Sequence, residues 1–390
     1  MGYELPGTMS TKAGLAVAIA TVAAGVLLLI PALGRYCASC VTERSVYPFT
    51  VMMTAYTTYA GLAAGLVLVA SLGRLLGRLD DKWTSHILWA SLGLLVAAWI
   101  TVFLDLGRPD HAAWLLLNWQ SSSRVAWMPV FYAVLVLPLL VILIGYVRGD
   151  NTRYPKALLV AAIAAAVLLE VNLGSVFGFA VGVPAWSGLY PAFSFLVAGV
   201  AGGAAAAALL APLGAKLHGS SGKPPVRPLA SLAAGAMVLY LIVECWRLLQ
   251  ADYYPGLRSF YEVVGAGIWL ELGLMVATVA LLLLAYAARS YRVLAVASVI
   301  LLVSLVAAKH SFIIHGQEAR LESQLVAPVN PYKVLYEGTA YHVSGADAAG
   351  VAAALLLGLG VFALGEVLLA LEPGEKPARM FLFRSIGGKS

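Results

Sequence analysis

The chain has 390 residues, of which 61% are hydrophobic and only 11% are charged. A soluble protein of this length does not show that balance, so the composition excludes a water-soluble enzyme and predicts an integral membrane protein. The formal net charge of +6 requires no nucleic-acid partner, because the excess lies in loops that face anionic lipid.

Ten apolar stretches follow one another along the chain. Each is close to or longer than the roughly 20 residues that a spanning helix needs, and backbone groups in hydrocarbon must be satisfied within the segment. The first is expected to be retained rather than cleaved, because its apolar run is long and lacks a small-residue cleavage pattern. We therefore predict an all-α integral membrane protein with about ten transmembrane helices. The predicted spans are 12–32, 47–72, 84–105, 125–148, 156–181, 190–213, 229–250, 260–288, 291–314 and 346–371.

Lys and Arg are more numerous in the loops on the side of the N-terminus than in the loops on the other side. By the positive-inside rule, this predicts a multi-pass protein of the cell membrane with both termini in the cytoplasm. The loop from Asp105 to Arg124 is then external. No loop is long enough for a large soluble domain, so a large catalytic domain would have to come from another chain.

Four segments are expected along the chain. Residues 1–46 would hold the first helix and an external Cys-x-x-Cys loop, and 47–188 a first helical bundle with a quinone site. Residues 189–345 would form a second bundle with an external loop, and 346–390 the last helix with a cytoplasmic tail. The Gly-, Pro- and Ser-rich stretch 216–228 is the most linker-like segment of the chain and could separate two helical bundles.

The cysteines and histidines predict neither a metal nor a haem in this chain. Cys37 and Cys40 are expected to form a disulfide in the oxidising external compartment, since Val41 stands where haem attachment needs His. Two further zinc ligands are not evident nearby. Among the histidines, only His310 and His315 lie near one span, and a spacing of five does not put them on one helix face.

Four polar side chains on three predicted helices share one depth in the outer half of the membrane. Asp105 and Glu170 are candidate proton acceptors, while Tyr56 and Asn172 could hydrogen-bond a quinol. Quinol oxidation needs hydrogen bonds to the ring oxygens and a base for each proton, and ionisable residues inside a membrane are functional candidates. Arg108 could join them.

Structural roles remain open for the same residues. Asp105 and Arg108 are three apart and could pair at a helix end. Asn172 could form a hydrogen bond between helices, and Tyr56 could belong to an interfacial aromatic belt.

The second half contains further ionisable residues within or at the ends of spans. Their cost in lipid motivates a proton path, although structural pairing, such as Glu271 with Lys309, is an equal alternative. The candidates for the path are Glu244, Glu271 and Lys309, with Glu366 near the last helix end.

Several motifs resemble one known family. The stretch from Asp105 to Trp114, DLGRPDHAAW, and the stretch from Asn118 to Trp127, NWQSSSRVAW, resemble the Gly-Arg-Pro loop and Ser-rich turn of the NrfD/PsrC family of polysulfide reductase membrane subunits. The stretch from Tyr56 to Gly65 resembles that family's Gly-rich early helix. A later helix and loop also match, in the segments 172–178, 184–186 and 191–193; together the matches cover roughly 47–205.

The resemblance implies a membrane anchor that binds menaquinone and menaquinol without haem, built from two four-helix bundles with one flanking helix at each end. It implies an iron-sulfur (ferredoxin-like) subunit and a molybdopterin catalytic subunit on the external face. Two positions depart from the family pattern. The segment 49–56 has no counterpart of the family's quinone-site His, and Asn172 stands in the place of a family Tyr.

We therefore expect a subunit that oxidises menaquinol at the external side and passes the electrons to an iron-sulfur partner. The alternatives are a proton-coupled secondary transporter and a structural anchor without a quinone site. Broken helices at matching positions of two inverted halves would favour the transporter, and no such pairs are evident.

Overall fold

The computed structural model describes residues 9–36, 49–106, 109, 112–147, 156–180, 182–319, 341–369 and 371–372. Ten helices are long and apolar enough to cross a membrane, and the described residues contain no β-strand. The predicted all-α membrane fold is therefore confirmed. The helices are α1 (Thr11–Ala32), α3 (Val51–Leu75), α4 (Asp81–Asp105), α6 (Arg124–Val147), α7 (Lys156–Gly178), α8 (Tyr190–His218), α9 (Val226–Gln250), α11 (Gly267–Ala288), α12 (Tyr291–His310) and α15 (Gly345–Leu368).

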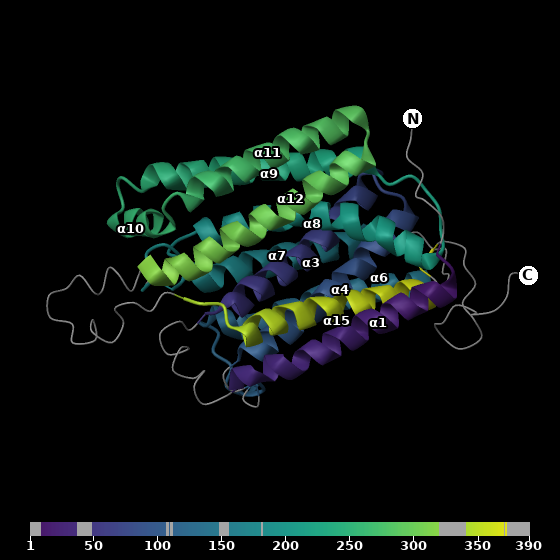
Figure 1. Ribbon diagram of the computed structural model, residues 1–390, viewed down its shortest axis with the longest axis horizontal. Coiled ribbons are helices and arrows are strands. Elements are labelled where there is room, and N and C mark those ends of the chain that lie inside the picture. The colour runs from purple at the N-terminus through teal and green to yellow at the C-terminus, as the bar shows by residue number, and fades with distance from the viewer. Residues whose placement is uncertain are drawn as a thin grey trace, which may run out of the picture.

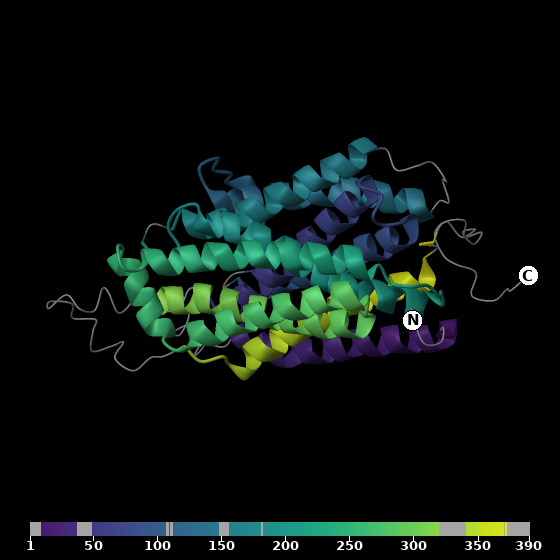
Figure 2. The same ribbon diagram turned by 90° about the horizontal axis from the view of Figure 1, so that it is seen from above.

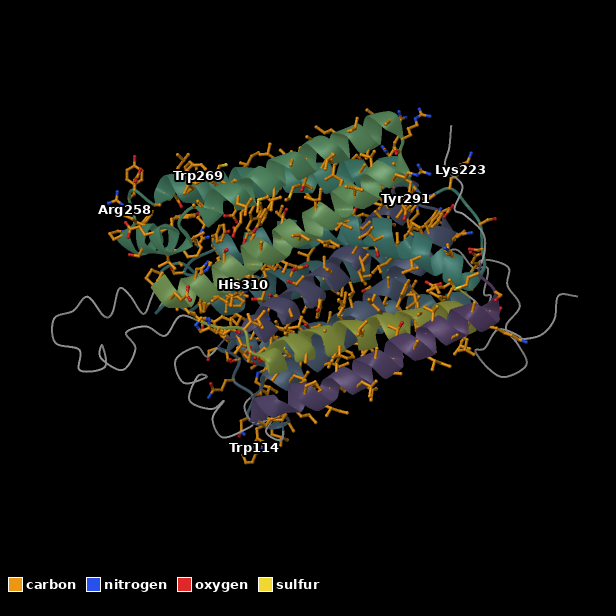
Figure 3. All side chains as sticks on the ribbon, in the orientation of Figure 1. Trp114, Lys223, Arg258, Trp269, Tyr291 and His310 are labelled. Atoms are coloured by element: carbon orange, nitrogen blue, oxygen red, sulfur yellow. The ribbon has the colours of Figure 1, made fainter. Side chains whose placement is uncertain are left out.

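Successive long helices run in opposite directions, so the molecule has two polar ends (Figure 1). We call the end that holds Thr11 and Leu368 the termini side, and the end that holds Ala32 and Gly345 the loop side. In Figure 3, Lys223 and Tyr291 lie at the termini side, whereas Arg258, Trp269 and His310 lie toward the loop side.

The helix α8 lies at the centre of the molecule. It packs against α3 and α7 on one side and against α9 and α12 on the other, as Figures 1 and 2 show. Small residues allow this close approach: a Cβ on Gly65 of α3 would overlap the backbone of Gly199, and one on Gly203 of α8 would overlap the backbone of Gly65. The helices α3, α4, α6 and α7 thus form one group, and α8, α9, α11 and α12 form a second group joined to it through α8.

The first and last long helices, α1 and α15, lie side by side at one edge of the molecule (Figure 1). The helix α15 also packs on α4, where the backbones of Gly93 and Gly358 touch. The flanking helices expected at the two ends of the sequence therefore form one pair in space. Most of α1 faces outward, since large side chains such as Leu27 and Ile30 are exposed, as expected for a helix surface in contact with lipid.

Two predicted spans differ in detail from the structure. The span predicted over 260–288 is broken: the short α10 (Pro255–Val264) ends at Gly265, whose φ of 57° stops the helix, and α11 begins at Gly267. The span predicted over 291–314 continues past α12 as a π-helical turn, Ser311–His315. Such turns change which side chains share a face.

Candidate functional site

Glu170 of α7 is the most deeply buried carboxylate in the loop-side half. Its side chain is 0% exposed, and neither carboxyl oxygen has a hydrogen-bond partner among the described residues. The carboxylate rests against α8 at Gly199, where a Cβ would overlap Oε1. A buried carboxyl group without hydrogen bonds is unfavourable as an anion, so a nearby cation or a proton must compensate it.

The nearby cation is Lys309 of α12. Its Nζ donates a hydrogen bond to the Thr57 backbone carbonyl at 2.8 Å and lies 4.7 Å from the Phe195 ring centroid. A Cβ on Gly61 would lie 3.0 Å from Lys309 Nζ and 3.3 Å from Glu170 Oε1. The absence of a side chain at this glycine therefore makes room for both charged groups between α3, α7, α8 and α12.

Two tyrosines extend this charge pair toward α6. The rings of Tyr56 on α3 and Tyr132 on α6 are 6.5 Å apart, and both side chains are buried. The Tyr132 hydroxyl lies within electrostatic range of both the Tyr56 hydroxyl and the Glu170 carboxyl. We call Tyr56, Tyr132, Glu170 and Lys309 the central cluster.

The other predicted residues lie elsewhere. Asp105 accepts a hydrogen bond from the Thr50 hydroxyl at 2.8 Å, which ties the end of α4 to the start of α3. The Asn172 amide donates to the Arg124 carbonyl at 3.2 Å and contacts Met128 Sδ at 2.9 Å. Residues two apart on a helix point in nearly opposite directions, so Asn172 faces α6 while Glu170 faces α8. Arg108, Cys37 and Cys40 lie outside the described residues.

A small pocket with a volume of about 10 Å³, room for roughly one water molecule, lies at the loop side of the second helix group and is lined in part by α10. We call it the vestibule. Glu244 accepts a hydrogen bond from the Tyr190 hydroxyl, and Glu271 accepts one from Ser311. The suggested pair of Glu271 with Lys309 is therefore not formed; Lys309 turns instead toward the first helix group.

Arg247 is the cation of the vestibule. It donates to the Ala185 carbonyl at 2.7 Å, and its guanidinium is held between the rings of Tyr190 and Phe260, at 4.2 and 4.5 Å from their centroids. The vestibule therefore combines two carboxylates, one cation and several aromatic rings at a membrane boundary, a composition suited to transferring protons.

Sequence reasoning overlooked Tyr132 and His86. Tyr132 lies among apolar residues of α6, some buried, such as Leu135, and some exposed, such as Leu137, so no local pattern marked it. His86 lies inside α4 and is 0% exposed, which corrects the statement that only His310 and His315 lie near a span. The π-helical turn also brings the rings of those two histidines to 6.2 Å. The described residues contain no group of three or more metal-ligating side chains.

Comparison with known families is decisive at this point. The profile described as Polysulphide reductase, NrfD matches residues 38–319. The chain belongs to the NrfD family. It is thus a multi-pass membrane subunit of an oxidoreductase of the polysulfide reductase type. The match includes the whole central cluster and the vestibule, whereas α1 and α15 lie outside it. Comparison with curated proteins gives no match.

Proposed function

We propose that this NrfD-family subunit oxidises menaquinol in the loop-side half of the first helix group. The observation that carries the proposal is the fully buried Glu170 carboxylate, which has no hydrogen-bond partner in the described part of the chain and lies near Lys309 and Tyr132. A group that only fixed the fold would lose free energy by leaving two buried oxygens unpaired. A proton acceptor must instead keep an oxygen available for the proton.

Oxidation of a quinol to a quinone releases two electrons and two protons. In this proposal the Tyr56 and Tyr132 hydroxyls hydrogen-bond a ring oxygen, and Glu170 takes a proton from it. The Lys309 ammonium stabilises the carboxylate before the transfer and is released from that role afterwards. Glu170 would take the two protons one at a time, releasing the first before it accepts the second. The two electrons would leave to iron-sulfur clusters of a partner subunit, so atoms and charge balance.

Access for a lipid-soluble quinol is supported between α4 and α6. The helix α4 packs closely on α3 and α15 but has little contact with α6. At this seam the Trp99 ring is 37% exposed and lies 6.1 Å from the buried Tyr132 ring. A quinol ring that enters from the lipid here meets aromatic surfaces first and the two tyrosine hydroxyls next.

A route for protons away from the cluster runs through the second helix group. Lys309 and Ser311 are two residues apart, so their side chains face opposite sides of the helix: Lys309 faces the central cluster, and Ser311 bonds Glu271 in the vestibule, where Glu244 is a second carboxylate. A proton that crosses this helix would pass from the cluster to the vestibule. The π-helical turn that begins at Ser311 is the kind of irregular helix that is frequent at functional sites. Protons taken by Glu170 would thus emerge on the loop side.

The loop side is then the external face, where an iron-sulfur subunit and a molybdopterin catalytic subunit would dock, and both termini are cytoplasmic. Asp105 lies at the end of α4 on this face, close to where electrons must leave. The terminal acceptor binds to another subunit, so this chain sets only the quinone chemistry.

The test is a fluorescence-quench titration of the purified complex with a tight menaquinol-analogue inhibitor. Tyr56→Phe removes a proposed hydrogen bond, which should weaken binding about threefold to tenfold. Tyr59→Phe is the matched control, since Tyr59 is one turn away, equally buried, and donates to the Val351 carbonyl instead. Saturable binding that weakens in Tyr56→Phe and Glu170→Gln supports the proposal. No binding to an active wild-type complex would favour a transporter or a bare anchor.

A further inference from the structure

A second cluster of buried ionisable groups lies at the termini side, where α4, α8 and α15 meet. The His86 imidazole uses both ring nitrogens there: Nδ1 lies 2.8 Å from Glu366 Oε2, and Nε2 lies 3.4 Å from Glu372 Oε1. An imidazole that bridges two carboxylates can receive a proton at one nitrogen while it releases one from the other.

Burial is graded along these three groups. The Glu372 side chain is 19% exposed and also contacts Lys82 Nζ at 3.0 Å, while His86 and Glu366 are both 0% exposed. The hydrogen bonds therefore lead from a partly exposed carboxylate at the membrane surface, through one imidazole, to a carboxylate inside the helix bundle.

Glu366 is the innermost group of this series of hydrogen bonds, and one of its carboxyl oxygens is left without a partner among the described residues. Its Oε1 is buried and has no hydrogen-bond partner among the described residues, and a Cβ on Gly214 of α8 would lie 2.5 Å from that oxygen. His218 of α8 approaches from the other side: its Nδ1 lies 2.7 Å from the Glu366 carbonyl oxygen and 4.0 Å from Oε2. An ion pair that served only to fix α15 would have no reason to leave one buried oxygen unpaired.

Two buried carboxylates of neighbouring helices lie against glycines of α8. Glu366 lies against Gly214, and Glu170 lies against Gly199. At roughly 1.5 Å per residue, the two glycines are about 22 Å apart along the axis of α8. Ser71 of α3 and Ser298 of α12, on helices that pack against α8, have buried hydroxyl oxygens without partners among the described residues. Both serines lie in the termini-side half of the molecule, toward Gly214.

We propose that Glu372, His86 and Glu366 form a proton inlet that loads the membrane interior from the termini side. Glu372 passes a proton to His86 Nε2, and His86 releases its Nδ1 proton to Glu366. One proton is transferred and the charge of the imidazole is unchanged. The ring is left with its proton on Nε2, and it must return to the Nδ1–H tautomer before the next transfer. The inlet would take up protons from the termini side during turnover. It rests on the proposed quinol oxidation only because that reaction supplies the driving force. Its Glu366 lies outside the family-matched residues 38–319.

The test uses the whole complex in vesicles that contain a trapped pH dye, with a membrane-impermeant electron acceptor added outside. Only complexes with the loop side outward then turn over, and their inlets face the lumen. Wild type should make the lumen alkaline in step with electron transfer. His86→Gln and Glu366→Gln should each lower that alkalinisation per electron at least tenfold. Arg74→Gln, which breaks the Arg74 and Asp81 ion pair at the same face, should leave it unchanged.

Chemical rescue distinguishes proton transfer by His86 from a purely structural role of this residue. In His86→Ala, imidazole added on both sides of the membrane should restore a measurable part of the alkalinisation per electron, once the lumen's buffering capacity is recalibrated with imidazole present. Unchanged uptake in His86→Gln, or no lumen alkalinisation in a wild-type complex that transfers electrons, would overturn the inlet. Loss of quinol-driven electron transfer in wild type would instead overturn the proposed function, so the two failures are distinguishable.

Discussion

Glu170 of α7 and Lys309 of α12 meet beside Gly61 of α3, far apart in sequence and each inside its own helix group. Their proximity places opposite charges in the buried interior of the helix bundle, where each charge is stable only when the other is present. Most of the following predictions concern this pair or the groups connected to it.

Removal of one partner should destabilise the protein more than removal of both. Lys309→Met leaves Glu170 buried without its cation, and loss of one member of a buried pair costs about 3–5 kcal/mol. The double variant Glu170→Gln with Lys309→Met should recover a large part of that loss. SDS-unfolding titrations of the four proteins would measure this coupling. Strictly additive effects would show that the two groups do not interact.

The room that Gly199 of α8 leaves for the Glu170 carboxylate should matter for quinol oxidation as much as the charge of that carboxylate does. Gly199→Ala puts a methyl group where the Glu170 carboxylate lies, so the carboxylate must move and quinol oxidation should fall at least tenfold. Gly145→Ala on α6 is the control, because a Cβ there has no neighbour within 4 Å. Steady-state quinol oxidation with an artificial acceptor measures both. Equal activity in the two variants would show that the carboxylate position is unimportant.

Proton release should depend on the vestibule. Glu271→Gln retains an acceptor for Ser311 but removes the titratable group. We expect slower release of protons on the loop side during turnover, with quinol-inhibitor affinity unchanged because the central cluster is intact. A pH-sensitive dye outside the vesicles records the release. Release that matches wild type per electron would remove Glu271 from the path.

Acid should loosen the termini-side cluster. Burial alone would raise the pKa of Glu372, but hydrogen bonds from His86, Ser220 and Lys82, together with the Lys82 charge, outweigh it and hold that pKa below its ordinary value. A lowered folded-state pKa stabilises the protein above the ordinary Glu value of about 4.3, and this stability is lost as the pH falls toward the folded-state value. The difference in Tm between wild type and Glu372→Gln should thus be full near neutral pH and shrink below about pH 4. A difference independent of pH would contradict this.

The spans were predictable because each needs only a long apolar run, and the all-helical fold follows from that requirement. The break at Gly265 was hidden, since the apolar residues of α10 and α11 read as one stretch. The central cluster was predictable in part. Glu170 stood out as a carboxylate deep in an apolar run, and a helical wheel would have separated it from Asn172.

The remaining site residues depend on contacts between distant helices. Nothing local in the sequence pairs Lys309 with Glu170, because the packing of α12 on α3 and α8 decides it. His86 carried a usable signal, an imidazole more than a turn inside a span beginning at Asp81, but its partners Glu366 and Glu372 come from the other end of the chain. The family match itself ends before those two residues.

The central claim is that Glu170 takes a proton as quinol is oxidised. The most direct test is rapid mixing of menaquinol with the oxidised complex, with reduction of the partner's iron-sulfur clusters followed by freeze-quench EPR. Loss of a general base should slow cluster reduction in Glu170→Gln roughly 100-fold or more, while Tyr59→Phe and direct reduction by dithionite stay at wild-type rates. Cluster reduction by menaquinol at the wild-type rate in Glu170→Gln would contradict the account.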